Sequence, residues 1–264
     1  METINNKIIY IYMTSSPEVQ ALCASDERLS LLIEHYGSLS YSLHTDVFSF
    51  FIETIIGQML SNKAADAIAA CMYKLCGGEL TGEAVLKLDT TALKNIGLSG
   101  QKADYILGFA SLMDKQPDYF KDLTEAPDEE VIKCLTSSRG IGAWTSKMYL
   151  IFVLNRLDVL PYEDGAFLQV YKWLYGTDDI KPPSIKQKCA PWKPYSSIAT
   201  RYFYRALDQG LMQDASLSEK RRLKNSTPKK SPRKRAKFPA FLRGGLRSQY
   251  FILHKRHALL CYNL

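Results

Sequence analysis

The sequence predicts an all-α fold, because apolar residues recur at helical spacing through most of the first 210 positions. Glycines divide this pattern at Gly37, Gly77-Gly78 and Gly97–Gly100, which is typical of helices joined by short turns. The beginning of the chain differs, since Lys7–Met13 is β-prone and is expected to form one edge strand or a frayed arm.

The first helix is expected over residues 17–35. Ser16-Pro17 marks its start, because proline is favoured in the first helical turn, and Gly37 ends it. Its apolar stripe consists of Val19, Leu22, Leu29, Leu32 and Ile33.

Two further helical stretches follow, Val47–Leu60 with Asp46 as its N-cap and the Ala-rich Asn62–Cys76. Gln58 is unusual in so apolar a run. It is either core filler whose amide is satisfied by the backbone, or a functional group at a helix end. Leu80–Met113 is then expected to form two or three short helices, broken at the glycines near residue 97.

A glycine-containing turn between two helical patterns carries the candidate chemistry. Gly140 and Gly142 let the backbone turn and approach another surface closely. The N–H groups of Gly140, Gly142 and Thr145, at the start of the second helix, would bind an anion such as a phosphodiester oxygen. That helix leads to two carboxylates, Glu163 and Asp164. By themselves, these features are equally those of a plain turn and a solvated acidic pair.

Three motifs together resemble the helix-hairpin-helix DNA glycosylase superfamily, and within it the 3-methyladenine DNA glycosylase II (AlkA-like) branch. They occur in the family's order and cover about residues 17–210. The motifs are IIGQMLS at 55–61 with Lys63-Ala64-Ala65, GIGAWT at 140–145 with DVLPYED at 158–164, and WKPYSS at 192–197.

The resemblance implies an all-α, two-lobed fold with a cleft between the lobes. The N-terminal helices and the last helix would form one lobe, and the middle helices the other. About 45 residues precede the first motif, too few for the N-terminal sheet domain of larger members. The expected division is 1–44 as an arm and first helix that pack with the C-terminal lobe, 45–212 as the glycosylase domain (helical lobe 46–125, hairpin and catalytic region 126–212), and 213–264 as a basic, disordered tail.

The resemblance also implies which residues contact DNA. Gln58 and Met59 would enter the minor groove, and Met59 would wedge into the gap left by an extruded nucleotide, where a flexible apolar side chain is suitable. The hairpin residues that would bind DNA are Gly140, Gly142, Trp144 and Thr145. The segment from Leu93 to Ala103, which includes Lys102, resembles a pair of packing helices and is assigned to the scaffold.

Asp164 occupies the family's catalytic position, the second acidic residue of its motif. A carboxylate there stabilises an oxocarbenium-like sugar and orients water. An alkylated purine already carries positive charge, so it leaves without a paired general acid. Glu163 is the neighbouring alternative. Tyr204 falls where relatives carry a base-stacking tryptophan, and stacking is worth about 1–3 kcal/mol per base; the alternative for this ring is core packing.

Trp144 determines the expected reaction type. Bifunctional relatives carry a lysine at this position, which forms a Schiff base, and tryptophan cannot do so. Lys147 stands three residues after this position and is a poor substitute. The resemblance therefore implies a monofunctional enzyme without lyase activity, although Trp144 can also serve as a packing anchor. The departures from the family's pattern are Arg139, Met148, Gly165 and Tyr204.

Neither an iron–sulfur cluster nor another cofactor is expected, because the six cysteines show no CxxC and no metal spacing. The family implies one exception, a monovalent cation held by the backbone carbonyls of Thr136, Ser138 and Ile141. No stretch approaches the roughly 20 apolar residues of a membrane span. Without a basic segment at the N-terminus, an intracellular protein with reduced thiols is expected.

The net charge of +7 is unevenly distributed. Residues 212–264 hold 14 Lys or Arg and 2 Asp or Glu, a balance of +12, which leaves the remainder at −5. An acidic body can still bind DNA if its positive groups gather in one cleft. Ser216–Lys237 is expected to be disordered, and it either holds DNA by salt-sensitive contacts or keeps the protein soluble.

These features together predict a monomeric, monofunctional DNA-repair glycosylase that acts on alkylated purines in damaged double-stranded DNA. Two alternatives remain open. One is a glycosylase of the same fold for an oxidised or mispaired base, and the other is a non-catalytic helix-hairpin-helix DNA-binding protein.

Overall fold

The computed structural model describes residues 2–4 and 7–210, which form two compact units. The first unit contains the residues up to Tyr10 together with Tyr41–Pro161. The second contains Ile11–Ser40 together with the described residues from Tyr162 onward. The expected disordered tail at 213–264 lies outside the described residues, as does Cys261.

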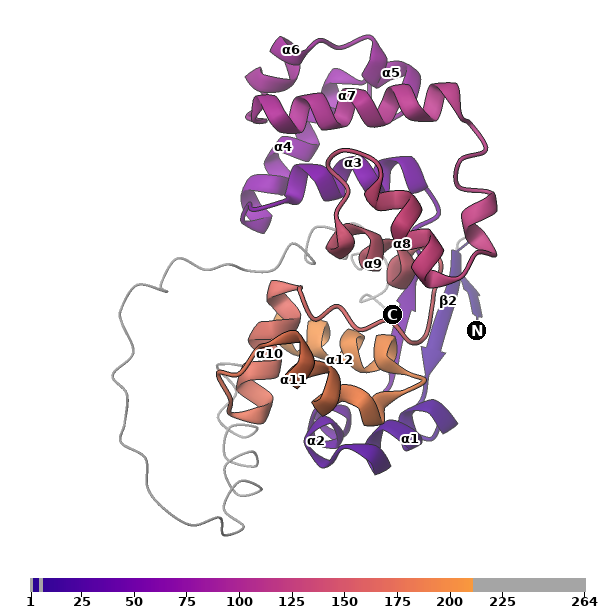
Figure 1. Ribbon diagram of the computed structural model, residues 1–264, viewed down its shortest axis with the longest axis vertical. Coiled ribbons are helices and arrows are strands. Elements are labelled where there is room, and N and C mark those ends of the chain that lie inside the picture. The colour runs from indigo at the N-terminus through magenta and orange to yellow at the C-terminus, as the bar shows by residue number, and fades with distance from the viewer. Residues whose placement is uncertain (1, 5–6, 211–264) are drawn as a thin grey trace, which may run out of the picture. The chain divides into compact units, whose positions relative to one another are not determined.

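Helices dominate both units, which confirms the predicted all-α class (Figure 1). Those of the first unit are α3 (Val47–Gly57), α4 (Asn62–Leu75), α5 (Gly82–Leu86), α6 (Thr90–Asn95), α7 (Gly100–Lys115), the 3₁₀ turn η1 (Asp122–Thr124), α8 (Asp128–Thr136) and α9 (Ala143–Phe152). Those of the second are α1 (Pro17–Ser25), α2 (Glu27–Tyr36), α10 (Gly165–Tyr175), α11 (Pro182–Cys189), the 3₁₀ turn η2 (Ala190–Trp192) and α12 (Ser196–Asp208).

Helix α3 is the central element of the first unit, in contact with α4 and α7. Asp46 caps it as predicted, because its carboxylate accepts from the Ser49 N–H at 3.0 Å. The ring of Phe51 is fully buried and lies 5.1 Å from that of Phe109 and 5.3 Å from that of Tyr149. Such aromatic pairs fix α3 against α7 and α9.

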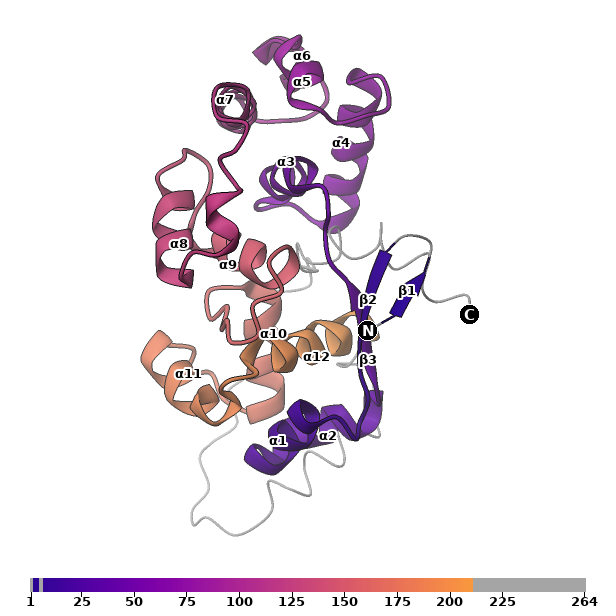
Figure 2. The same ribbon diagram turned by 90° about the vertical axis from the view of Figure 1, so that its right-hand side faces the viewer.

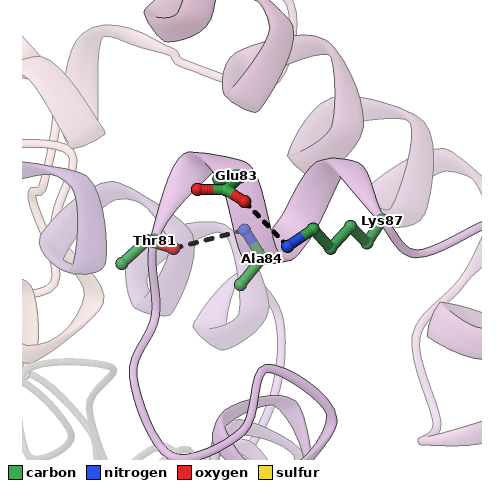
Figure 3. A network of polar contacts seen from close by, with 4 residues as sticks. All are labelled: Thr81, Glu83, Ala84 and Lys87. Atoms are coloured by element: carbon green, nitrogen blue, oxygen red, sulfur yellow. Dashed lines mark hydrogen bonds and ion pairs between the residues drawn. The ribbon is translucent and has the colours of Figure 1, made fainter.

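The short helices α5 and α6 pack against α7, as Figure 2 shows where α7 is seen almost end-on. Helix α5 is only five residues long and relies on local polar contacts (Figure 3). Thr81 Oγ1 accepts from the Ala84 N–H at 3.2 Å, and an ion pair of 2.7 Å joins Lys87 to Glu83 one turn earlier. The predicted break near Gly97–Gly100 is confirmed, and α5 and α6 are short as expected, but α7 is a long helix of 16 residues.

In the second unit, the predicted single helix over residues 17–35 is wrong, because Asp26 divides it into α1 and α2. Asp26 adopts an extended backbone (φ −147°), and its side chain accepts from the N–H groups of Arg28 and Leu29 as the N-cap of α2. Aspartate favours caps over helix interiors, because its carboxylate competes for backbone donors.

Helix α2 contacts α10 and α12, and α1, α2 and α12 lie in the same unit. The division along the chain differs from the expected boundary at residue 126. Residues 126–161, which include the hairpin, belong to the first unit, and the second unit resumes at Tyr162.

A three-stranded sheet of order β1-β2-β3 adds to the helices, formed by β1 (Glu2–Ile4), β2 (Lys7–Tyr12) and β3 (Leu39–Ser42). Strands β1 and β2 pair antiparallel with Glu2 opposite Ile9. The β-prone run is therefore a strand, but it lies in the middle of the sheet and not at its edge as predicted, and neither β1 nor β3 had a counterpart among the predicted elements. Among the described residues, no helix has the length and apolarity that spanning a membrane requires.

Candidate functional site

The hairpin between α8 and α9 is a tight turn that needs glycine at one position. Gly140 has a left-handed backbone (φ 87°). A Cβ placed on it would stand 2.5 Å from Cγ of Tyr105, so both the conformation and the close contact exclude other residues. The turn is closed by a hydrogen bond of 3.2 Å from the Ile141 N–H to the Ser138 carbonyl.

Gly142 is the N-cap of α9, and having no side chain it contributes no capping acceptor to the first turn. Apart from its chain neighbours, no described atom lies within 4 Å of the place where its Cβ would stand. The other hairpin residues are Trp144, which is half-buried, and Thr145, which is buried. An uncapped helix start beside open space suits an approaching anion.

The loop between α3 and α4 projects one apolar side chain. Met59 is 88% exposed and has a left-handed backbone (φ 58°) that is rare for a residue with a Cβ. Before it, the half-buried Gln58 donates from Nε2 to the Gly140 carbonyl at 2.8 Å. The first unit therefore joins the predicted wedge loop directly to the predicted hairpin, across 82 positions of sequence.

The sequence assigned Lys102 of α7 only to the scaffold and gave Tyr105 no role, and the structure gives both residues further contacts. Lys102 Nζ donates to the carbonyls of Ile56 and Gln58, and Tyr105 is the ring that packs against Gly140. The only feature of the sequence that could have indicated this role is a lysine in a predicted packing helix. Local periodicity cannot predict its hydrogen-bond partners, because they lie far away in the sequence.

A groove of about 1100 Å³ lies between α7 and the hairpin. Its polar walls include Arg139 and the phenol of Tyr119, which donates to the Cys134 carbonyl at 3.3 Å. Burial raises the pKa of Tyr119 to about 12, so this phenol stays protonated at neutral pH. Arg139, the departure from the family's pattern, thus places a cation beside the hairpin.

Asp164 belongs to the second unit, where it is the N-cap of α10. Its Oδ1 accepts from the Phe167 N–H at 2.8 Å, and the side chain is 3% exposed. An ionised carboxylate at this place would stabilise positive charge on a sugar. Its neighbour Glu163 is exposed, and apart from its chain neighbours and the nearby backbone of α10, nothing described lies within 4 Å of a Cβ built on Gly165.

Tyr204, also in the second unit, is completely buried and has no open ring face on which a base could stack. Its neighbour Phe203 packs on Phe167 at 5.2 Å and on Trp192 at 5.3 Å, which shows that this stretch of α12 is core. For Tyr204, the alternative of core packing is therefore the one that the structure shows. Met148 is likewise buried.

The described residues include no group of three or more His, Cys, Asp or Glu side chains that could hold a metal ion. The cation implied by the family would use backbone carbonyls, those of Thr136, Ser138 and Ile141. The Ser138 carbonyl already accepts one hydrogen bond and retains a second lone pair.

Comparison with known proteins gives concordant matches. Residues 52–194 match the family described as "HhH-GPD superfamily base excision DNA repair protein". The alkylbase DNA glycosidase-like protein mag2 of Schizosaccharomyces pombe is 27% identical, over 69% of this chain and 89% of that protein. The crystal structure of a DNA-3-methyladenine glycosidase from Bacillus halodurans has a TM-score of 0.68 and 34% identity, over 80% of this chain and 98% of that one. The S. pombe 3-methyladenine DNA glycosylase Mag1, solved in complex with abasic DNA, has a TM-score of 0.60 and 25% identity, over 70% and 95%.

Proposed function

Because the chain belongs to the HhH-GPD superfamily of base excision DNA repair proteins, we propose that it is a monofunctional glycosylase for alkylated purines in duplex DNA. It extrudes the damaged nucleotide, hydrolyses the bond between base and sugar with Asp164, and leaves an abasic site. It acts as a monomer inside the cell, where its DNA substrate is.

One observation carries the DNA-binding part of this proposal. The 2.8 Å hydrogen bond from Gln58 to Gly140 joins an exposed apolar side chain, Met59, to a helix start suited to phosphate. A side chain that fills the gap in a base stack is effective only if the protein also binds the phosphate backbone of the DNA nearby. Met59 is suited to the first task and the start of α9 to the second.

The chemistry rests on Asp164. Its carboxylate stabilises positive charge on the sugar and orients the attacking water, while the charged base departs as a neutral molecule. The alternative acid, Glu163, is exposed and does not cap α10. Trp144 at the position of the Schiff-base lysine supports hydrolysis without strand cleavage.

A base-release assay tests the proposal. Purified protein is incubated with methylated duplex DNA, the released bases are identified by chromatography, and strand breaks are counted before and after alkali. We expect release of methylated purines and breaks only after alkali. Asp164→Asn should lower release by about 10²–10³-fold with DNA binding retained.

Three other outcomes would contradict the proposal. Release from oxoguanine-containing duplex alone would assign another lesion, and full base release by Asp164→Asn would assign the chemistry to another residue. Breaks without alkali, together with a protein–DNA adduct trapped by borohydride, would indicate a lyase that uses an amine such as Lys147.

A further inference from the structure

The C-terminal end of α3 is held by a side chain from another helix. The last carbonyls of a helix lack intrahelical partners. Lys102 Nζ, from α7, donates to the Ile56 carbonyl at 2.8 Å and to the Gln58 carbonyl at 2.6 Å. One ammonium group thus bridges the final turn of α3 and the first peptide group beyond it, from 46 and 44 residues away.

Backbone donors satisfy the carbonyls that Lys102 does not reach. Ile55 accepts from the Gln58 N–H at 3.3 Å, and Gly57 accepts from the Leu60 N–H at 3.1 Å. All four carbonyls from Ile55 to Gln58 therefore have a partner, and Lys102 supplies half of them.

The Gln58 carbonyl matters most, because it belongs to the peptide group directly before Met59. The orientation of that group sets φ of Met59, which is 58°. A left-handed conformation costs a residue with a Cβ about 1–3 kcal/mol and persists only where its surroundings impose it. An 88% exposed side chain cannot impose it by its own packing, so the restraint comes from the backbone.

Helix α7 also contacts the hairpin. Tyr105 lies three positions after Lys102, on the same helix face, and its ring fills the space in which a Cβ on Gly140 would stand. The side chain of Gln58 donates to the Gly140 carbonyl. The wedge loop, α7 and the hairpin are thus tied pairwise, and the position of Met59 relative to the hairpin is fixed.

Stability by itself does not explain a lysine at this place. Burial lowers the pKa of Lys102, because the ammonium loses part of its hydration. Water could satisfy the same two carbonyls at a surface loop without that cost. Lys102 additionally ties both carbonyls to α7, which an exchanging water molecule does not do.

We propose that Lys102 is a positioning residue for nucleotide extrusion, which holds Met59 in its projecting, left-handed conformation at a fixed place beside the hairpin. This inference rests on the proposed glycosylase function. The catalytic step at Asp164 does not involve Lys102, so its loss should affect substrates according to how firmly their bases are stacked.

The test compares single-turnover base release by the wild-type protein, Lys102→Met, Met59→Ala and the double variant. Each is assayed on one alkylated purine in a fully paired duplex and on the same base in a one-nucleotide bulge. We expect Lys102→Met to slow release from the paired duplex about tenfold and from the bulge less than about threefold. The double variant should be no slower than Met59→Ala, because the two residues act as one unit.

Lys115→Met is the matched control, since it removes the same charge from the exposed end of the same helix and should leave both rates unchanged. Thermal unfolding checks each variant. If Lys102→Met melts far below the wild type, Lys102→Gln, which keeps a polar end but is too short to bridge both carbonyls, takes its place.

Fluorescence of 2-aminopurine beside the lesion provides a readout that does not depend on catalysis. Wild-type protein should raise the emission by unstacking this base, and Lys102→Met and Met59→Ala should not. Equal slowing on both substrates, additive effects in the double variant, or an unchanged fluorescence rise in Lys102→Met would each overturn the role of Lys102. If wild-type protein releases no alkylated base, the proposed function fails. The fluorescence comparison then still decides whether Lys102 positions Met59 for unstacking a base.

Discussion

In the second unit a carboxylate, Asp26, gathers donors from three elements, whereas in the first unit an ammonium, Lys102, reaches two acceptors at one helix end. Asp26 caps α2, accepts from Trp192 Nε1 at 3.1 Å and accepts from the hydroxyl of Tyr175. Tyr175 lies 149 positions after Asp26, and Trp192 lies 166 positions after it, so this one side chain joins the beginning of the unit to its end.

The two arrangements differ in what depends on them. Asp26, Tyr175 and Trp192 are all buried, and burial beside Asp26 raises the pKa of Tyr175 well above its ordinary value. Ile56 and Gln58, whose carbonyls accept from Lys102, instead come just before Met59, which has the most exposed of the large apolar side chains described. We infer that the polar cluster of the second unit serves stability and that of the first serves function.

The largest expected effect is on the Asp26 cluster. Asp26→Asn keeps the shape and can still cap α2, but its amide nitrogen can accept from neither Tyr175 nor Trp192. Losing a bond to a charged group and leaving a buried donor unpaired should cost about 3 kcal/mol of unfolding free energy, measured by urea denaturation. The rate of base release per folded molecule should not change. Slower base release by Asp26→Asn with an unchanged unfolding free energy would mean that the Asp26 cluster serves function and not stability.

Gly140→Ala should have the next largest effect, because it forces a left-handed backbone on alanine and pushes the new methyl group into Tyr105. We expect about 2 kcal/mol of destabilisation in denaturant titrations. Gly142→Ala is the matched comparison, since its φ of −100° is ordinary and the space around it is open. A shift of more than about 0.5 kcal/mol there would mean that the turn is fragile as a whole.

A smaller effect of opposite sign is expected at Met59. Glycine accepts the left-handed conformation without strain, so Met59→Gly should raise the unfolding free energy by up to about 1 kcal/mol while base release from paired duplex slows. Differential scanning calorimetry and the single-turnover assay measure the two changes. Loss of stability in this variant would show that the methionine side chain packs on the protein and does not serve as a wedge.

The smallest expected effect is on the pH dependence of stability. Lys102 has a lowered pKa in the folded state, so in the window below its ordinary value of 10.5 the unfolded state binds more protons. The unfolding free energy of the wild type should therefore rise with pH in that window, relative to Lys102→Met. Denaturant titrations of both proteins at pH 8 and 10 measure this difference, in which the contributions of the buried tyrosines cancel. A relative fall would mean that Lys102 is stabilised in its charged form.

Local patterns in the sequence were sufficient for most helices of the first unit. The Asp46 cap and the glycine breaks near residue 97 act on their own neighbours, and both were predicted correctly. The break at Asp26 was missed because the apolar stripe continues across it, and the residues that require an extended aspartate there lie beyond position 170.

The candidate site shows the same limit. The motif placed Met59 and Gly140 at functional positions, and the structure finds one exposed and the other closely packed. The bond of Gln58 to Gly140 and the reach of Lys102 to α3 join residues far apart in sequence, so periodicity could not predict them. Tyr204 was placed by counting from a motif, and its burial follows from neighbours that such counting does not include.

The discontinuity of the second unit has a consequence for biosynthesis. Residues 11–40 leave the ribosome long before Trp192 and Tyr175, and at cellular elongation rates the interval is on the order of ten seconds. Through that time the nascent chain exposes the apolar faces of α1 and α2, which include Val19 and Leu29, while the continuous stretch from Tyr41 to Pro161 can already fold. We therefore expect the N-terminal helices to be the segment that most needs chaperones during translation.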